Sequence, residues 1–141
     1  MKNIIKEDKN ITSVLKDDAV KTIELKKFEN LNSINIGEIM KEMGPAPWAT
    51  RVVYNKDFGG VLICQNPGEG NRKHYHPNAD ECWIIISGEW EWFIDGVGTK
   101  KVKEKDIIVV PKKTIHQITC KGTKPGIRFA ITVPDVNHVY V

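Results

Sequence analysis

Hydrophobic and polar residues alternate over short distances through most of the chain. From Ala49 onward, short segments rich in β-branched and aromatic residues recur about every ten residues, with Gly, Pro, Asn or Asp between them. This pattern is typical of an all-β sandwich or barrel. The expected strands are 51–55, 61–66, 81–87, 89–95, 100–102, 107–110, 115–120 and 127–133.

Two segments, 82–86 and 107–110, are apolar at both alternating positions. Side chains of a strand point in turn to its two faces, so both faces of these strands should be covered. One face can line the inside of a barrel, while the other packs against a partner subunit or the N-terminal segment. The pattern therefore favours a homodimer.

The first 45 residues are rich in Lys, Asn, Asp and Ile and contain few aromatic residues. A strand could form over residues 20–28. We expect residues 1–45 to form an arm or cap with a short helix, and residues 46–141 to form the barrel.

The short helix is predicted over residues 33–43. Its apolar residues would share one face, and Gly44 with Pro45 would end it. We expect core contacts from that face, which carries Ile36, Ile39, Met40 and Met43.

Composition and charge add few constraints. A chain of 141 residues can bury about two-thirds of its unfolded surface, so a bound metal ion would serve function rather than folding. The net charge of +3 comes from lysines spread over most segments, which disfavours nucleic acid as a partner and suits an anionic substrate. The apolar runs are too short to span a bilayer, and the first ten residues lack the apolar stretch of a signal peptide. We expect a cytoplasmic protein without membrane contact.

Three cysteines, Cys64, Cys82 and Cys120, lie in apolar segments without CxxC spacing. An unpaired cysteine behaves as a small hydrophobic residue. We therefore expect buried free thiols rather than redox or nucleophilic groups.

Candidate metal ligands are concentrated around residue 75. Residues two apart on a strand point to the same face with Cα atoms about 7 Å apart, so His74 and His76 can converge on one ion. A turn would then bring Glu81 to the start of the next strand, and His116 offers a third imidazole. Imidazole suits Fe, Ni, Cu and Zn, and the added carboxylate favours Fe(II) or Mn(II). We expect one divalent ion, preferably Fe(II), with Mn, Ni, Co or Zn as alternatives.

The segment from Gly68 to Gly88 resembles the first motif of the cupin superfamily, G-x5-H-x-H-x3-4-E-x6-G. Its histidine and glutamate positions are His74, His76 and Glu81. The resemblance implies a jelly-roll β-barrel with the metal ion inside. The alternative is a cupin that has lost its metal, in which these histidines are ordinary core or surface residues.

The second cupin motif, G-x5-P-x-G-x2-H-x3-N, is matched at Pro111 and His116. Lys105 and Lys113 occupy its glycine positions, and Cys120 replaces its asparagine. These differences concern the turns more than the ligands. The fourth histidine, His138, lies outside both motifs, and we expect it at the surface.

Aromatic residues could line the cavity beside the ion. Trp83 shares a strand face with Glu81, so it is either a wall of the site or a plain core residue. Trp90 and Trp92 alternate with two glutamates, and alternation alone does not decide which pair faces inward. We take Trp83 and Trp92 as candidate substrate contacts.

Two arginines lie on expected strands. Arg128 interrupts an apolar segment, and an inward arginine there would need an anion or a carboxylate as partner. A solvated outer face is the alternative reading for it. Arg51 has the same two interpretations. Either could hold the anionic group of a substrate.

Three imidazoles and one carboxylate would leave coordination positions open on an ion. The leading hypothesis is an Fe(II) dioxygenase that acts on a small polar or anionic metabolite. The second hypothesis is a metal-dependent isomerase, epimerase or lyase for a sugar or carboxylate. The third is a cupin that binds a small ligand without turnover, since one fold hosts all three.

Overall fold

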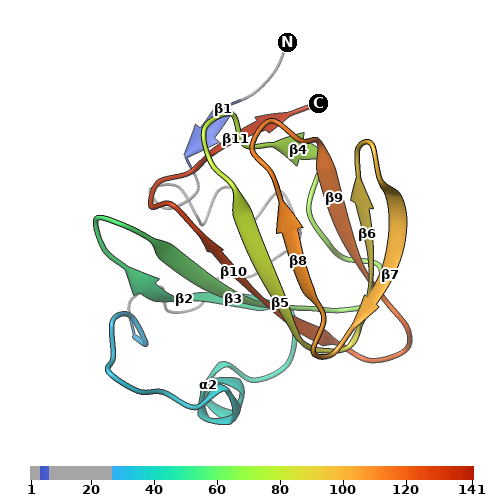
Figure 1. The fold of residues 1–141 in the computed structure, drawn as a ribbon. Coiled ribbons are helices and arrows are strands. Elements are labelled where there is room, and N and C mark those ends of the chain that lie inside the picture. Colours follow the sequence, from blue (N-terminus) through green and yellow to red (C-terminus); the bar gives the residue numbers. More distant parts are fainter. Residues whose placement is uncertain (1–3, 7–26) are drawn as a thin grey trace.

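The computed structural model describes residues 4–6 and 27–141. These residues form two antiparallel sheets and one short helix (Figure 1). The elements are β1 (Ile4–Lys6), α2 (Ile36–Met43), β2 (Trp48–Tyr54), β3 (Gly59–Gln65), β4 (His74–Tyr75), β5 (Glu81–Ser87), β6 (Glu89–Ile94), β7 (Gly98–Lys103), β8 (Ile107–Val110), β9 (His116–Lys121), β10 (Gly126–Thr132) and β11 (Asn137–Tyr140). The all-β prediction with one short helix is confirmed.

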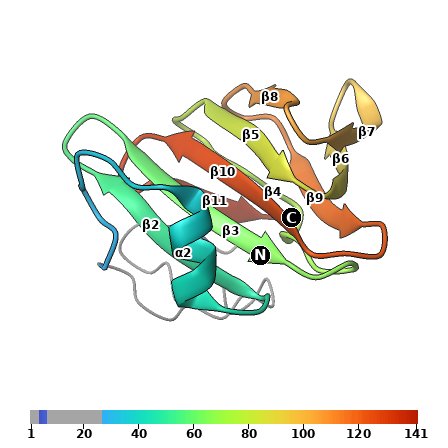
Figure 2. The same ribbon diagram turned by 90° about the horizontal axis from the view of Figure 1, so that it is seen from below.

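Within the described residues, the strand order is β1-β11-β4-β9-β6-β7 in one sheet and β2-β3-β10-β5-β8 in the other. The two sheets face each other, and their inward side chains form a cluster that we call the barrel core (Figure 2). It contains Ala49, Val61, Ile63, Trp83, Ile85, Trp90, Trp92, Ile94, Val102, Ile108, Val110, Ile118, Cys120 and Ala130.

A second cluster, the helix-side core, lies between α2 and the outer face of β2, β3 and β10 (Figure 2). Its buried members are Phe28, Ile39, Met43, Trp48, Leu62, Cys64 and Ile127. Inward and outward residues alternate along each strand, so neighbouring positions such as Leu62 and Ile63 enter different cores. One sheet therefore supports both cores.

The helix begins after Asn35, whose side chain accepts a hydrogen bond from Gly37 N at 2.8 Å. It ends at Gly44, which has a φ of 78° and donates its N–H to Met40 O. The expected apolar face is only partly correct, because Met40 is 46% exposed while Ile39 and Met43 are buried. Ile39 and Met43 are one turn apart and meet the sheet, and Met40 is rotated about 100° away from Ile39.

The expected strand at residues 20–28 lies largely outside the described residues, and Lys27 and Phe28 belong to a turn. Within the part of the chain that is described, no helix has the length and apolar character needed to cross a bilayer.

The coverage expected for the strands that are apolar on both faces is incomplete. On β8, Ile108 and Val110 are buried, but Ile107 and Val109 are 65% and 62% exposed. The strand ends the order of its sheet, while α2 covers the opposite edge at β2 and β3 (Figure 2). Within the described residues, the outer face of β8 is therefore open.

Two lysines adopt the backbone conformation that glycine usually supplies. Lys105 and Lys113 have φ values of 78° and 67°. Backbone hydrogen bonds hold both, from Lys105 N to Ile85 O at 2.9 Å and from Lys113 N to His76 O at 2.7 Å. The turns that precede β8 and β9 are thus retained without glycine.

Candidate metal centre

Three strands bring the expected ligands together between the two sheets. Antiparallel pairing of β4 with β9 sets His74 opposite His116, and His76 follows directly after β4. Glu81 opens β5 in the other sheet, and its carboxylate lies against the rings of His76 and His116. All four residues are buried, with exposed fractions of 1–2%.

The imidazole rings are close enough for their nitrogens to converge. Ring centroids are 4.9 Å apart for His74 and His76, 4.3 Å for His74 and His116, and 5.2 Å for His76 and His116. The Glu81 carboxylate bridges two of them, with Oε2 3.3 Å from His76 Nε2 and Oε1 3.4 Å from His116 Nε2.

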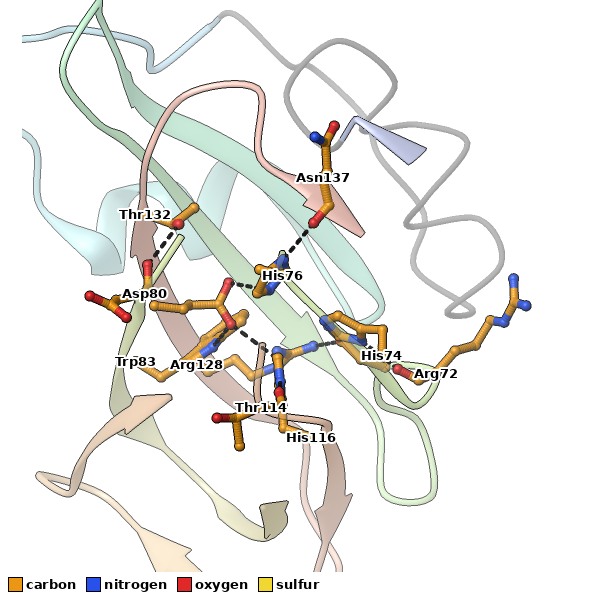
Figure 3. Close-up of polar contacts among 12 residues, drawn as sticks. Arg72, His74, His76, Asp80, Trp83, Thr114, His116, Arg128, Thr132 and Asn137 are labelled. Atoms are coloured by element: carbon orange, nitrogen blue, oxygen red, sulfur yellow. Dashed lines mark hydrogen bonds and ion pairs between the residues drawn. The ribbon is translucent and has the colours of Figure 1, made fainter. Parts of the chain in front are cut away.

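Backbone carbonyls orient all three rings. The Nδ1 atoms of His74, His76 and His116 lie 2.5, 2.9 and 2.9 Å from the carbonyl oxygens of Arg72, Asn137 and Thr114 (Figure 3). A carbonyl can only accept, so each Nδ1 carries a proton, and in the neutral ring Nε2 is the atom that holds the lone pair. Metal-binding histidines typically have such partners, which fix the ring and the tautomer.

The electrostatics of the cluster favour the protonation states that ligands need. Burial is the main cause that holds the pKa of His74 well below its ordinary value, and charge on His138, His116 and His76 acts in the same direction. His74 is therefore neutral near pH 7.

Glu81 has the complementary state. Burial, the largest single influence, acts to raise the pKa of its carboxyl. The charges and hydrogen bonds of His76 and His116 together act more strongly in the opposite direction, so the pKa lies well below its ordinary value. Glu81 is ionised at neutral pH, as a ligand must be.

These residues fit a divalent ion. The buried His74 Nε2 has no hydrogen-bond partner among the described residues, and a buried lone pair without a partner is costly. Two overlapping groups hold ligand atoms within 4.8 Å of one another, one of His76, Glu81 and His116 and the other of His74, His76 and His138. Of the four expected ligands, His76, Glu81 and His116 form the first group, and His74 belongs to the second together with His76.

The position of His138 contradicts the prediction of a surface residue, because it is only 1% exposed. Short strand β11 pairs antiparallel with β4, with Tyr140 opposite His74 and Val139 opposite Tyr75. This pairing turns His138 inward beside His74 and His76. The sequence carried little indication that His138 is buried, because β11 has only four residues and no clear alternation of apolar and polar residues.

Arg128 lies inside the barrel, so its outer-face alternative is wrong. Its guanidinium stacks over Trp83 at 4.3 Å from the ring centroid and is fully buried. It donates to Gln65 Oε1 at 3.2 and 2.9 Å and also to Asn71 Oδ1. Figure 3 shows the side chain beside Trp83, reaching toward the histidines.

The sequence analysis missed Gln65 and Asn71, which hold this arginine. Asn71 is within the first motif segment and could have been suspected there. Gln65 ends a strand of apolar residues, and its position beside Arg128 depends on the pairing of β3 with β10.

Arg51 is also buried, at 6% exposed, but it faces a carboxylate of its own chain. Its Nε lies 3.0 Å from Glu29 Oε2, and its guanidinium stacks 4.0 Å from the Tyr54 ring. The charge is already balanced by Glu29, so Arg51 is a weaker candidate than Arg128 for a substrate anion.

The tryptophans, and not the glutamates that alternate with them, face inward on β6. Trp90 and Trp92 are 1% and 0% exposed, whereas Glu89 is exposed. Trp92 packs edge-on against Trp83 with centroids 5.4 Å apart. Trp83 also donates its N–H to Glu81 Oε1 at 2.5 Å, which links the aromatic wall to the metal-ligand cluster.

Comparison with known proteins gives a family and a set of similar folds. A family model described as a cupin domain matches residues 61–132. No protein of curated function matches the chain at a significant level.

Three solved structures illustrate the similarity. An uncharacterized conserved protein with a double-stranded β-helix domain from Klebsiella pneumoniae is 21% identical over 79% of this chain and 99% of that chain, with a TM-score of 0.67. A sugar phosphate isomerase of the cupin superfamily from Silicibacter pomeroyi is 22% identical over 55% of this chain and 50% of that chain, with a TM-score of 0.51. The DMSP lyase DddQ from Ruegeria pomeroyi is 17% identical over 62% of this chain and 46% of that chain, with a TM-score of 0.55. At such low identity the likeness shows the fold alone.

Proposed function

The chain belongs to the cupin domain family, and from this premise we propose that it is a metal-dependent enzyme acting on a small polar or anionic metabolite. The observation that carries the proposal is the buried cluster of His74, His76, Glu81 and His116, whose rings are all oriented by backbone carbonyls. A closed structural zinc site would more often use cysteines, and the chain's cysteines lie elsewhere.

His74, His76, Glu81 and His116 would hold the ion in this proposal. When bound, the ion would supply either redox chemistry with dioxygen or Lewis acidity toward a carbonyl or carboxylate. The Trp83 N–H fixes one carboxylate oxygen of Glu81, and the burial of all four residues would limit the access of bulk water to the centre.

Arg128 would bind the anionic group of the substrate. Gln65 and Asn71 hold its guanidinium through neutral amide oxygens, which orient the group without removing its charge. A guanidinium fixed in this way suits a carboxylate or phosphate, because its planar fork can donate two parallel hydrogen bonds. Trp92 adds a buried indole N–H that has no hydrogen-bond partner among the described residues.

Our first candidate for the reaction is Fe(II)-dependent dioxygenation. Three imidazoles and a carboxylate suit Fe(II) and leave coordination positions open. The test is oxygen uptake by the iron-loaded protein against a panel of small carboxylates, sugar acids and sugar phosphates, with His76→Ala as the control. Uptake that depends on one metabolite and on His76 would support the assignment.

Isomerisation or elimination is the second candidate. It is favoured by the sugar phosphate isomerase and the lyase among the proteins of similar fold. Product formation from the same panel without oxygen uptake would select this class. Binding of a metabolite with neither uptake nor product would instead leave a ligand-binding cupin and contradict an enzyme.

We also propose a homodimer that forms through the outer face of β8. Ile107, Val109 and Val97 are 65%, 62% and 58% exposed and line a groove of about 510 Å³ between β7 and β8. An exposed apolar edge strand is a template for pairing with another strand, and a second β8 offers the same apolar face in return.

Light scattering coupled to gel filtration tests this dimer. Val109→Lys should convert a dimer into a monomer, while Lys112→Ala should not. A monomer at micromolar concentration in the unmodified protein would contradict the proposal. The cytoplasmic location stays a prediction, which cell fractionation would test.

A further inference from the structure

His138 is a buried histidine that neither the expected ligand set nor the family match at residues 61–132 explains. It lies on β11, which lines the same end of the barrel as β4. The neighbouring carbonyl of Asn137 orients the His76 ring through a contact of 2.9 Å. Strand β11 is therefore already part of the framework of the metal centre.

The geometry places His138 beside two of the expected ligands. Its ring centroid lies 4.7 Å from that of His74 and 4.6 Å from that of His76. One ligand atom from each of these three histidines lies within 4.8 Å of the other two. Two nitrogens on opposite sides of an ion stand about 4.2 Å apart when each bond is about 2.1 Å, so only small shifts would bring all three onto one ion.

The two overlapping groups differ in chemistry. His74, His76 and His138 offer three imidazole nitrogens, whereas His76, Glu81 and His116 offer two nitrogens and a carboxylate. The Nδ1 of His76 faces a carbonyl, so this ring has a single lone pair to give and can serve only one ion at a time. The groups therefore describe two adjoining positions for one ion.

Resting on the metal centre of the proposed function, we propose that His138 is a further metal ligand of this chain, which completes an all-imidazole position with His74 and His76. Nitrogen-preferring ions such as Ni²⁺ would use this position, and oxygen-preferring ions such as Mn²⁺ would use the position that contains Glu81. The choice of metal would then depend on His138 as well as on the cupin motifs.

A purely structural role for His138 makes a different prediction. Its ring lies 6.0 Å from the Tyr140 ring at an interplanar angle of 23°, which is a stacking contact. Phenylalanine preserves such stacking but offers no ligand atom. His138→Phe therefore separates packing from metal binding.

The experiment measures Ni²⁺ and Mn²⁺ affinities of the full chain by competition with a chromophoric chelator. Ni²⁺ is preferred to Cu²⁺ because the chain has three free thiols that Cu²⁺ can oxidise. The variants are His138→Phe, Glu81→Gln and the control Val139→Ala, which alters the same strand at the neighbouring position. Thermal melting of each apoprotein shows whether the fold is retained.

We expect His138→Phe to weaken Ni²⁺ binding about tenfold or more and to change Mn²⁺ binding about threefold or less. The ratio of the Ni²⁺ affinity to the Mn²⁺ affinity should therefore fall at least about threefold, which corresponds to about 0.7 kcal/mol in binding free energy. Glu81→Gln should show the opposite order, and Val139→Ala should leave the ratio of the two affinities unchanged. Equal Ni²⁺ affinity in the unmodified protein and His138→Phe would overturn the inference while leaving the metal centre intact. Failure of the unmodified protein to bind either ion would instead overturn the proposed function.

Discussion

The two cores of this protein share strands but differ in character. Along β10, Ile127 and Phe129 point into the helix-side core, whereas Arg128 points into the barrel. The helix-side core is apolar, while the barrel interior combines tryptophans with a guanidinium, a carboxylate and several imidazoles. Buried charges are costly unless they are paired or bind ions, so the barrel interior carries a cost that the helix-side core does not.

This difference suggests a division of labour. The helix-side core stabilises the fold through burial of apolar surface. The polar groups buried in the barrel lower the stability of the fold in exchange for a site that can bind ligands. Changes on the helix side should therefore alter unfolding but not metal or ligand binding. Changes among the polar groups of the barrel should do the reverse.

The largest effect is expected in the helix-side core. Ile39→Ala should lower the free energy of unfolding by about 2–5 kcal/mol, because Ile39 is 1% exposed and its loss leaves a cavity. Urea denaturation measures this change. Met40→Ala is the matched control on the same helix and should stay within about 0.5 kcal/mol, because Met40 is largely exposed. Loss of metal affinity in folded Ile39→Ala would break the comparison.

The next effect concerns the guanidinium in the barrel. Arg128→Lys should weaken binding of an anionic substrate about tenfold or more, since charge-assisted hydrogen bonds contribute roughly 1.5–3 kcal/mol and an ammonium does not match the fork. Calorimetric titration with the metabolite found by the activity panel measures it, and metal content should not change. Arg51→Lys is the control, because Glu29 already faces that side chain. A loss of affinity in Arg51→Lys alone would move the anion site to the other arginine.

A smaller effect, of opposite sign, is expected in the turns that frame the barrel site. Lys105→Gly and Lys113→Gly should each stabilise the fold by about 1 kcal/mol, because both lysines have positive φ, which costs L-residues about 1–2 kcal/mol. Lys112→Gly, at ordinary φ, should instead destabilise it slightly. Thermal melting compares the three variants. Destabilisation by glycine at both positions would show that the lysine side chains make contacts that outweigh the backbone strain.

The smallest effect is a difference in thiol reactivity. Burial, with lesser effects from Cys120 and Glu69, raises the pKa of Cys64 in the helix-side core to about 11. Its contribution to stability is present below the ordinary pKa of 9.0 and is lost as the pH rises toward 11. Iodoacetamide should label Cys64 slowly at pH 8 and faster between pH 9 and 11, whereas the half-buried Cys82 should react first. Rapid labelling of Cys64 at pH 8 would mean that the helix side opens readily.

Local pattern predicted most of the fold. Runs of β-branched and apolar residues between turn residues predicted both β5 and β8 with their correct bounds, and the motif spacing predicted four of the residues that gather at the site. The exposed face of β8 was not predicted. Apolar residues on both faces of a strand indicate that each face could be buried, but they do not identify the segment or subunit that would bury it. The sequence could not predict on which face of its strand Arg128 lies. Its burial depends on hydrogen-bond partners from β3 and from the segment before β4, which are distant in the chain.

The short strands account for the remaining errors. Strand β4 has two residues and β11 has four, which is too few for a periodic signal. Their positions follow from pairing with each other and with β9, which joins residues more than forty positions apart in the chain. His138 was assigned to the surface for this reason, although the pairing buries it beside the metal-ligand cluster.

Metal analysis of protein purified without added metal tests the central claim most directly, namely that the buried histidines and Glu81 bind a divalent ion. We predict stoichiometric metal in the unmodified protein and a sharp loss in His116→Ala, whose far-UV circular dichroism should match that of the unmodified protein. The loss follows from removing one imidazole whose Nε2 lies 3.4 Å from Glu81 Oε1 at the centre of the cluster. Full metal content in a folded His116→Ala protein, or none in the unmodified protein after supply of Fe(II), Mn(II), Ni(II) and Zn(II), would contradict the account.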